Sequence, residues 1–344
     1  MNAPLSSPRP RNGAWIPVET LDPWPAWRGF VGKTGPWAGE DLIRALLLKF
    51  CRGVWLEDES NFRSLAGTPV LFLANHQVAV ESILFAAALS PFLGAPVHAI
   101  AKQEHAGTWV GQLFGQLATH PGVQPLDTTF FYRLGDANAL LELIETLKAT
   151  MEARRCGLLV HAAASRVLTC RSAVRTLSSV FIDLAIRGRF SIVPVKFRGG
   201  LPAAPLEGFL DFPVGYGAQD FCVGRAITPD DLTRVPFRER RDLVLDRINT
   251  LGGDLADETP APADPGFGRD VAAFMERYGV LEPAFAVLWA ALKRLPAPTP
   301  AIAEMLAGID AGHLTTGASP QDRWTAQVTR WLTENRMPVA VRTA

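Results

Sequence analysis

The chain is 344 residues long, with 48% hydrophobic and 20% charged residues, a composition that excludes an intrinsically disordered protein. Its 34 Lys and Arg balance 34 Asp and Glu, so the formal net charge of +0 gives no reason to expect a nucleic-acid partner. Because a single core seldom grows beyond about 250–300 residues, the length allows one large core or two domains.

Four cysteines are scattered along the chain, with no CxxC pair and no histidine at metal-ligand spacing: Cys51, Cys156, Cys170 and Cys222. We therefore expect neither a zinc site nor a disulfide framework. The sequence predicts no metal and no permanently bound cofactor.

The longest uncharged stretch, Ser82 to Ala101, is interrupted by Pro91, Gly94 and Pro96. It predicts a helix, a turn and a buried strand instead of a membrane span. The first 36 residues lack the basic, apolar and small-residue pattern of a signal peptide. We expect a cytoplasmic protein, and peripheral contact with the inner face of a membrane stays open.

The first elements follow a proline-rich start. Residues 1–37 carry seven prolines and no clear period, which predicts an N-terminal arm. Apolar residues at helical spacing between 42 and 50 predict a helix, a polar stretch covers 57–64, and the apolar run at 69–74 predicts a buried strand.

From this strand onward, helices and strands alternate. Helices are predicted at 80–89, 106–117, 136–154, 175–187 and 237–252, and strands at 97–101, 121–126, 157–161, 191–196, 208–212 and 221–225. The alternation predicts an α/β fold whose mixed, largely parallel sheet is flanked by helices.

The C-terminal third has no strand pattern. Residues 259–267 contain three prolines and no apolar period, which predicts a linker. Amphipathic segments at 268–294 and 321–334 then predict a helical extension over 268–344. The division along the chain is therefore an arm at 1–37, a main domain at 38–258, a linker and this extension.

A histidine and an acid follow the strand at 69–74. His76 leaves the strand at the carboxyl edge of the sheet, where α/β folds place their sites, and Glu81 opens the next helix. Residues five apart in one helix differ by roughly 140° around its axis, so the pair meets only if the chain bends between them. A carboxylate on one imidazole nitrogen would fix the tautomer and leave the other nitrogen free to accept a proton.

The same spacing has a plain interpretation. His76 would be an ordinary loop histidine, and Glu81 an acid favoured by the positive end of a helix dipole. An HxxxxE pattern alone does not separate the two interpretations.

Four blocks in order add context to this pair. The segment from Asn75 to Glu81 resembles the NHx4D block of the glycerolipid acyltransferase family, which includes the lysophosphatidic acid acyltransferases. Three later blocks also resemble that family: 130–133 (FFYR), 158–166 (LLVHAAASR) and 192–195 (IVPV), and the stretch 101–111 resembles the segment after its second strand. The resemblance covers roughly residues 55–250 and implies the family's fold.

The resemblance implies a role for each matching residue. It implies that His76 is the general base and Glu81 the carboxylate that orients it. It also implies substrate contacts for the residues of its blocks that could bind an acceptor or donor: Asn75, Lys102, Arg133, Ser165 and Arg166.

Two positions depart from the family pattern. Glu81 stands where the family usually has Asp, which keeps a carboxylate one methylene further out. In the third block, Ala163 and Ala164 replace the family's Glu and Gly, and Ser165 replaces Thr, which leaves Arg166 to grip an anionic group. Either the acceptor is not glycerol phosphate, or the domain has lost activity and binds acyl groups, lipids or a carrier protein.

The family's reaction implies the partners. An acyl chain would pass from a thioester of coenzyme A or acyl carrier protein, the co-substrate, to a hydroxyl or amine of a small-molecule or lipid acceptor. Backbone N–H groups at the start of the helix after His76 are the expected donors to the oxyanion. A thioesterase, with water in place of the acceptor, is a further alternative.

Positive charge gathers in one part of this neutral chain. Residues 148–200 hold ten Lys or Arg against two acids, Glu152 and Asp183. The cluster suits docking of an acidic carrier protein, a CoA phosphate or an anionic membrane, and a solvated surface explains it equally well. No aromatic residues are interleaved as in RNA-binding proteins, so no nucleic acid is expected.

Overall fold

A computed structural model describes residues 13–124, 129–132, 137–163, 165–279, 282–312 and 319–334. The chain forms two compact units, each drawn from three stretches of sequence. One unit comprises Met1–Trp27, Phe50–Gln103 and Asp127–Ala263, and the other comprises Arg28–Lys49, Glu104–Leu126 and Asp264–Ala344. The predicted division into arm, main domain, linker and extension describes consecutive segments of sequence instead of compact units, and it stays a prediction.

The described strands of the first unit form one eight-stranded sheet in the order β1-β2-β8-β7-β3-β6-β4-β5. Their bounds are β1 (Ala14–Pro17), β2 (Cys51–Leu56), β3 (Val70–Ala74), β4 (Val97–Lys102), β5 (Thr129–Tyr132), β6 (Gly157–His161), β7 (Ser191–Arg198) and β8 (Gln219–Val223). Among these described strands, the β1–β2 and β7–β8 pairs are antiparallel, and the other neighbouring pairs are parallel. The predicted α/β fold with a mixed, largely parallel sheet is confirmed.

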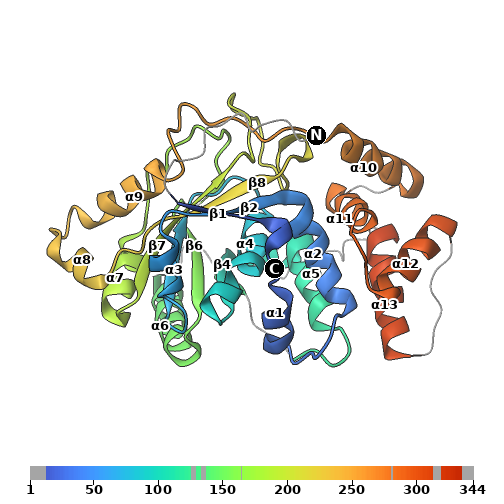
Figure 1. Ribbon diagram of the computed structural model, residues 1–344, viewed down its shortest axis with the longest axis horizontal. Coiled ribbons are helices and arrows are strands. Elements are labelled where there is room, and N and C mark those ends of the chain that lie inside the picture. Colours follow the sequence, from blue (N-terminus) through green and yellow to red (C-terminus); the bar gives the residue numbers. More distant parts are fainter. Residues whose placement is uncertain are drawn as a thin grey trace. The chain divides into compact units, whose positions relative to one another are not determined.

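Helices of the first unit cover both faces of the sheet. These are α3 (Glu59–Arg63), α4 (Glu81–Leu93), α6 (Ala137–Arg154), α7 (Ser179–Gly188), α8 (Pro229–Arg234) and α9 (Arg240–Thr250), and the short helices are η1 (Val18–Thr20) and η3 (Val214–Tyr216). Leu71 and Leu73 of β3 pack with α6, α7 and α9, whereas Phe72, on the other face of the strand, meets Phe85 of α4 edge-on. Figure 1 shows α7 and α9 on one side of the strands and α4 on the other. This alternation is what a strand buried on both faces requires.

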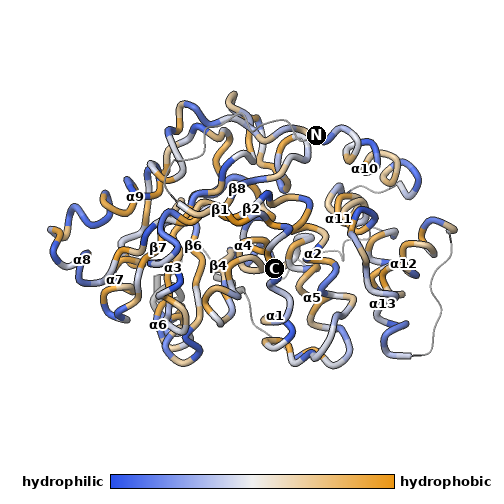
Figure 2. The backbone as a smooth tube through the Cα atoms, viewed as in Figure 1, coloured by the Kyte–Doolittle hydropathy of each residue, from blue (hydrophilic) through white to orange (hydrophobic). Residues whose placement is uncertain are grey.

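The apolar pattern of the chain agrees with these layers. Helix α4 is buried along most of its length and is orange in Figure 2, as is β6. Helix α9 instead buries Val244, Leu245 and Ile248 and exposes charged residues on its other side. Helix α4 therefore lies within the core, and α9 forms an outer layer.

The second unit is helical where the structure describes it. It contains α2 (Ala38–Phe50) up to Lys49, most of η2 (Gln103–Gly107), α5 (Trp109–Ala118), α10 (Pro265–Tyr278), α11 (Pro283–Lys293), α12 (Pro300–Ala311) and α13 (Pro320–Glu334). The indoles of Trp324 and Trp331 donate to Gln116 O (2.7 Å) and Gln112 Oε1 (2.8 Å), which ties α13 to α5. The predicted C-terminal helices are confirmed, with α12 as an addition. Within the described residues, no helix is both long and apolar enough to cross a membrane.

Part of the predicted N-terminal arm is structured. Residues 14–17 form β1, and α1 (Trp24–Phe30) follows. β1 pairs with β2, a strand that the sequence did not predict because Arg52 and Gly53 interrupt its apolar pattern. Gly53 lets the two strands come together, because a Cβ there would lie 2.4 Å from Ile16 O.

Two strand predictions are wrong or shifted. Residues 208–212 form no strand; the Leu210 and Asp211 carbonyls instead accept hydrogen bonds from Ala79 (3.3 Å) and Val80 (3.1 Å). Residues 121–122 form a turn where extended chain was predicted at 121–126, and residues 125–126 lie outside the described residues. The strand of this region is β5, a few residues later.

Phe72 tests whether the faces of the sheet hold the first unit together. Its side chain is fully buried between Phe62 and Phe85, so Phe72→Ala is expected to lower the free energy of unfolding by about 3–5 kcal/mol. Phe209→Ala, at a side chain that is 53% exposed, is expected to change it by less than about 0.5 kcal/mol. Urea unfolding of both variants makes the comparison, and equal losses would contradict this packing.

Candidate functional site

The site is built on the loop between β3 and α4. Asn75 continues the line of β3: its side-chain amide donates to Phe197 O (2.9 Å), and its side-chain oxygen accepts from Phe197 N (2.7 Å). These two bonds fix the start of the loop to β7. The predicted contact of Asn75 with substrate stays a prediction. In this structure its side-chain amide bonds the backbone of β7.

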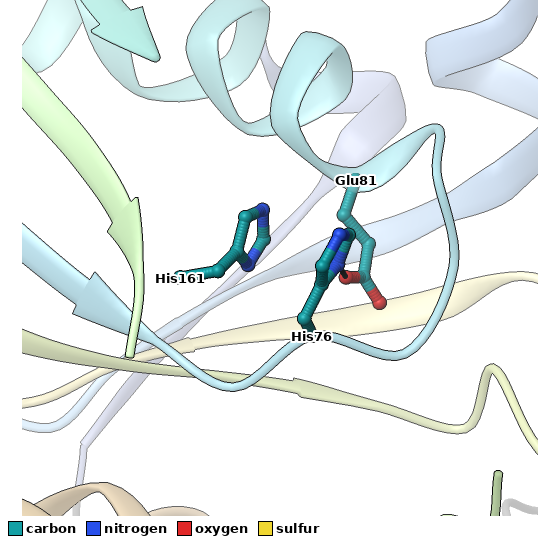
Figure 3. A group of neighbouring side chains, drawn as sticks. All are labelled: His76, Glu81 and His161. Carbon is teal, nitrogen blue, oxygen red and sulfur yellow. Dashed lines mark hydrogen bonds and ion pairs between the residues drawn. The ribbon is translucent and has the colours of Figure 1, made fainter. Parts of the chain in front are cut away.

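His76 and Glu81 meet across this loop. Nδ1 of His76 lies 3.1 Å from Oε2 of Glu81, and Figure 3 shows the carboxylate reaching from the first residue of α4 toward the ring. The Glu81 side chain is fully buried, whereas 19% of the His76 side chain is exposed. The ring therefore has its carboxylate contact inside the protein and retains access to solvent.

The backbone of the loop folds around the Glu81 carboxylate. The N–H groups of Gln77 (3.0 and 3.2 Å) and Val78 (3.1 Å) donate to its oxygens, and the Gln219 amide donates from β8 (2.8 Å). Burial raises the pKa of Glu81 to about 7, and these hydrogen bonds act against the rise because they favour the charged form. The donors identify the carboxylate as the form that the site is built to hold.

The contact with Glu81 assigns the tautomer of His76. A carboxylate that is surrounded by donors accepts a further hydrogen bond, so we place the proton of the neutral ring on Nδ1. Nε2 then carries the lone pair. This is the arrangement of a general base, which needs one nitrogen oriented and the other able to take a proton.

A second imidazole lies against the first. His161, at the end of β6, stacks on His76 with ring centroids 3.6 Å apart and planes 16° from parallel (Figure 3). Its Nδ1 lies 2.8 Å from the Asn75 carbonyl, which can only accept, so this nitrogen carries the proton. Nε2 then accepts from the Ser82 hydroxyl at 2.8 Å.

His161 stays neutral in this setting. Burial lowers its pKa to about 3, and the neighbouring His76 acts in the same direction. A neutral ring stacked on His76 fixes the plane of the latter without adding positive charge. We therefore assign His161 a positioning role toward His76.

A buried polar network continues behind Glu81. The Gln77 side chain accepts from Gly200 N (2.9 Å) and from Gln219 (3.2 Å), and it donates to Glu258 (2.9 Å). Glu258 in turn lies 3.6 Å from Nζ of Lys196 and 3.7 Å from Nε of Arg198. Side chains from distant parts of the sequence thus support the Glu81 carboxylate.

The other predicted site residues have different surroundings. Lys102 ends β4, two strands from β3 in the sheet, and Ser165 is exposed on the turn after β6. Arg133 lies outside the described residues. Their contacts with substrate stay predictions.

Arg166 is not open on all sides. Its Nη1 donates to Asp211 Oδ1 (2.8 Å) and to Leu210 O (2.6 Å), and the guanidinium lies 5.2 Å from the ring centroid of Phe209. Arg166, which the sequence predicts to bind an anionic group of the substrate, is therefore already paired with the Asp211 carboxylate.

Much of the basic segment at 148–200 is also paired inside the chain. Lys148 meets Glu152, Arg189 meets Asp230, and Lys196 and Arg198 face Glu258. These pairs lower the net positive charge that a docking partner would meet. Docking of a carrier protein or CoA phosphate on this segment stays a prediction.

One group in the described part of the chain has the composition of a metal site. His76, Glu81 and His161 bring a ligand atom each to within 4.8 Å of one another. The two rings are stacked face to face, so their lone pairs do not converge, and the nitrogens that face protein already bond Glu81, Asn75 and Ser82. The arrangement fits a hydrogen-bonded base better than a metal ligand set.

Sequence reasoning missed His161 and the network. His161 ends an apolar strand, as the residues before His76 do, and β3 pairs with β6 so that Ala74 lies opposite it. The position of His161 at the end of an apolar strand could therefore have predicted that it lies near His76. Gln219, Glu258 and Asp211 carry no local signal, because only the folded sheet brings them to the site.

Comparison with known proteins gives a weak likeness. No family model matches the chain, and no curated protein matches it. The chain is similar to the crystal structure of the 1-acyl-sn-glycerophosphate (LPA) acyltransferase PlsC from Thermotoga maritima, with a TM-score of 0.39 and 17% identity over 61% of this chain and 76% of that one. A likeness of this size does not identify a function, so we base the functional proposal on the geometry of the site.

The neutral state of His161 makes stability depend on pH. Its pKa is about 3 when folded and 6.5 ordinarily, so the folded chain binds fewer protons and loses this stability as pH falls from about 6.5 toward 3. His161→Asn, which can keep a donor for the Asn75 carbonyl, is expected to flatten the dependence by up to about 1.4 kcal/mol per pH unit.

Urea unfolding of both proteins at several pH values between about 4 and 7 measures this difference. The raised pKa of Glu81 contributes with the opposite sign, as stability that is lost when pH rises from about 4.5 to 7. Comparing parent and variant removes the part of the Glu81 contribution that both proteins share. Parallel pH profiles would contradict the neutral assignment.

Proposed function

We propose that this protein is an acyltransferase that moves an acyl group from a thioester to a hydroxyl or amine, with His76 as general base and Glu81 as the residue that orients it. The observation that carries the proposal is the 3.1 Å contact between Nδ1 of His76 and the fully buried Glu81 carboxylate. The ring itself is partly exposed, with 19% of the side chain accessible. The acyl chemistry itself is what the resemblance of the sequence blocks implies.

The reaction needs two proton transfers at His76, one onto Nε2 and one from it. Nε2 removes the proton of the acceptor as its oxygen or nitrogen attacks the thioester carbonyl, and the Glu81 carboxylate stabilises the imidazolium that forms. The tetrahedral intermediate then collapses, the carbon–sulfur bond breaks, and the thiolate takes the proton. No acyl-enzyme intermediate is required.

The four backbone N–H groups that directly follow His76 are all engaged within the chain. Those of Gln77 and Val78 donate to the Glu81 carboxylate. Those of residues 79 and 80 donate to the carbonyls of residues 210 and 211. The donor to the oxyanion is therefore not among residues 77–80, and the expectation that N–H groups at the start of α4, from Glu81 onward, bind it stays a prediction.

Substitution of His76 tests the proposal directly. His76→Ala is expected to lower the rate of acyl transfer from acyl-CoA or acyl carrier protein by about 10²–10⁴, the usual contribution of a positioned general base. Glu81→Gln is expected to lower it too, because an amide cannot stabilise the imidazolium as a carboxylate does. Thiol release with pooled alcohols and amines gives the rate, and mass spectrometry of the products identifies the acceptor.

His105→Ala is the matched control, since it removes a histidine of η2 in the other unit and is expected to leave the rate within about twofold. Release of free acid regardless of acceptor would point to a thioesterase. Donor binding without turnover, unaffected by His76→Ala, would point to a non-catalytic binding module. Either result would contradict acyl transfer at this site.

The pH profile provides a separate test. Because burial raises the pKa of Glu81 to about 7, the carboxylate gains a proton as pH falls through that value and no longer accepts from His76. We expect kcat/KM to decline on the acidic side of about pH 7, with an apparent value that belongs to the His76–Glu81 pair. Measurement from about pH 5.5 to 9 shows this decline, and a flat profile would rule out the need for an ionised Glu81.

A further inference from the structure

The feature that the proposed reaction does not use is the ion pair between Arg166 and Asp211. Arg166 lies close to the histidines: the next residue, Val167, donates its N–H to the His76 carbonyl at 2.9 Å. The charge of Arg166 also contributes to lowering the pKa of His161. A guanidinium beside a reactive histidine would normally offer a binding place for an anionic group of the substrate.

Asp211 already fills that place. Its Oδ1 accepts from Nη1 of Arg166 at 2.8 Å, and the Leu210 carbonyl accepts from the same nitrogen at 2.6 Å. The pair is partly covered, with 18% of the Arg166 side chain and 37% of the Asp211 side chain exposed. The guanidinium is therefore neutralised by the chain itself.

The backbone holds Asp211 where it is. Ala79 and Val80, which lie in the loop between His76 and Glu81, donate to the carbonyls of residues 210 and 211 at 3.3 and 3.1 Å. The segment that carries Asp211 is thus attached to the loop that carries the base. The carboxylate can move only by its own side-chain rotation, unless the loop moves as well.

We propose that Asp211 determines acceptor specificity, by occupying Arg166 and so excluding acceptors that carry a phosphate or another anionic group. This inference rests on the proposed acyltransferase function and narrows its acceptor to an alcohol or amine without an anionic group. An anion that approached Arg166 would either displace the Asp211 carboxylate from Nη1 or bind the other guanidinium N–H groups with that carboxylate beside it as a like charge. Both effects weaken binding of the anion.

Binding of glycerol phosphate, with uncharged glycerol as reference, tests the proposal without any acyl donor. Asp211→Asn removes the negative charge, and we expect it to bind glycerol phosphate at least about tenfold more tightly than the parent in calorimetric titration. The double variant Asp211→Asn/Arg166→Gln is expected to lose this gain. Asp230→Asn is the matched control, because it removes the acid of the Arg189–Asp230 ion pair. Arg189 lies just before the start of β7, at the end of the strand away from the site.

Two results would overturn the proposal. They are no gain over the parent in a folded Asp211→Asn variant, and a gain that persists without Arg166. If Asp211→Asn does not fold, the Arg166→Gln variant gives the test. We expect it to bind glycerol phosphate as weakly as the parent does. A loss of glycerol phosphate binding in this variant would contradict the proposal. Because binding is measured without turnover, failure of acyl transfer in the separate thiol-release assay is distinguishable from failure of this inference.

Discussion

The site depends on a single buried charge. The Glu81 carboxylate has no exposed surface, and an unpaired carboxylate in such a place costs several kcal/mol. The chain meets this requirement with two backbone N–H groups of the loop, the Gln219 amide and the His76 ring. The path of residues 76–80 follows from the need to bring these donors to one carboxylate, and the position of the His76 ring follows from that path.

Support for this charge comes from strands that are distant in sequence. Asn75 fastens the loop to β7, Gln219 enters from β8, and Gln77 links Gln219 to Glu258. Burial raises the pKa of Glu258 and lowers that of Lys196, and their opposite charges act against both shifts. His76 and Glu81 are therefore held by a network of buried side chains.

The fold and the site were predictable to different extents. The apolar runs that became β3, β6 and β7 stood out, because strands buried on both faces need uninterrupted apolar sequence. β2 was missed because Arg52 and Gly53 break its run, and the apolar segment at 208–212 looked like a strand but pairs with a loop. The pair His76 and Glu81 was recognisable because both partners lie close in sequence, within a block that resembles one of the glycerolipid acyltransferase family.

The rest of the site was not predictable in this way. The partner of Arg166 is 45 residues away, and Gln219 and Glu258 reach Glu81 and Gln77 only through the order of strands in the sheet. A single sequence carries patterns of period and spacing, whereas contacts between side chains of separate elements depend on register. The sequence alone therefore predicts Arg166 as an anion ligand, whereas the structure pairs it with Asp211.

Glu258 also has a consequence for how far the chain can be shortened. It stands after the last helix of the sheet unit, in a stretch without regular structure, and could be mistaken for the start of a dispensable tail. A chain cut back to the end of α9 would leave Lys196 and Arg198 as two neighbouring buried cations without their carboxylate, and Gln77 without its acceptor. The smallest portion of the unit that keeps His76 and Glu81 in place thus extends past its last helix, and the irregular residues there belong to the interior as much as any strand does.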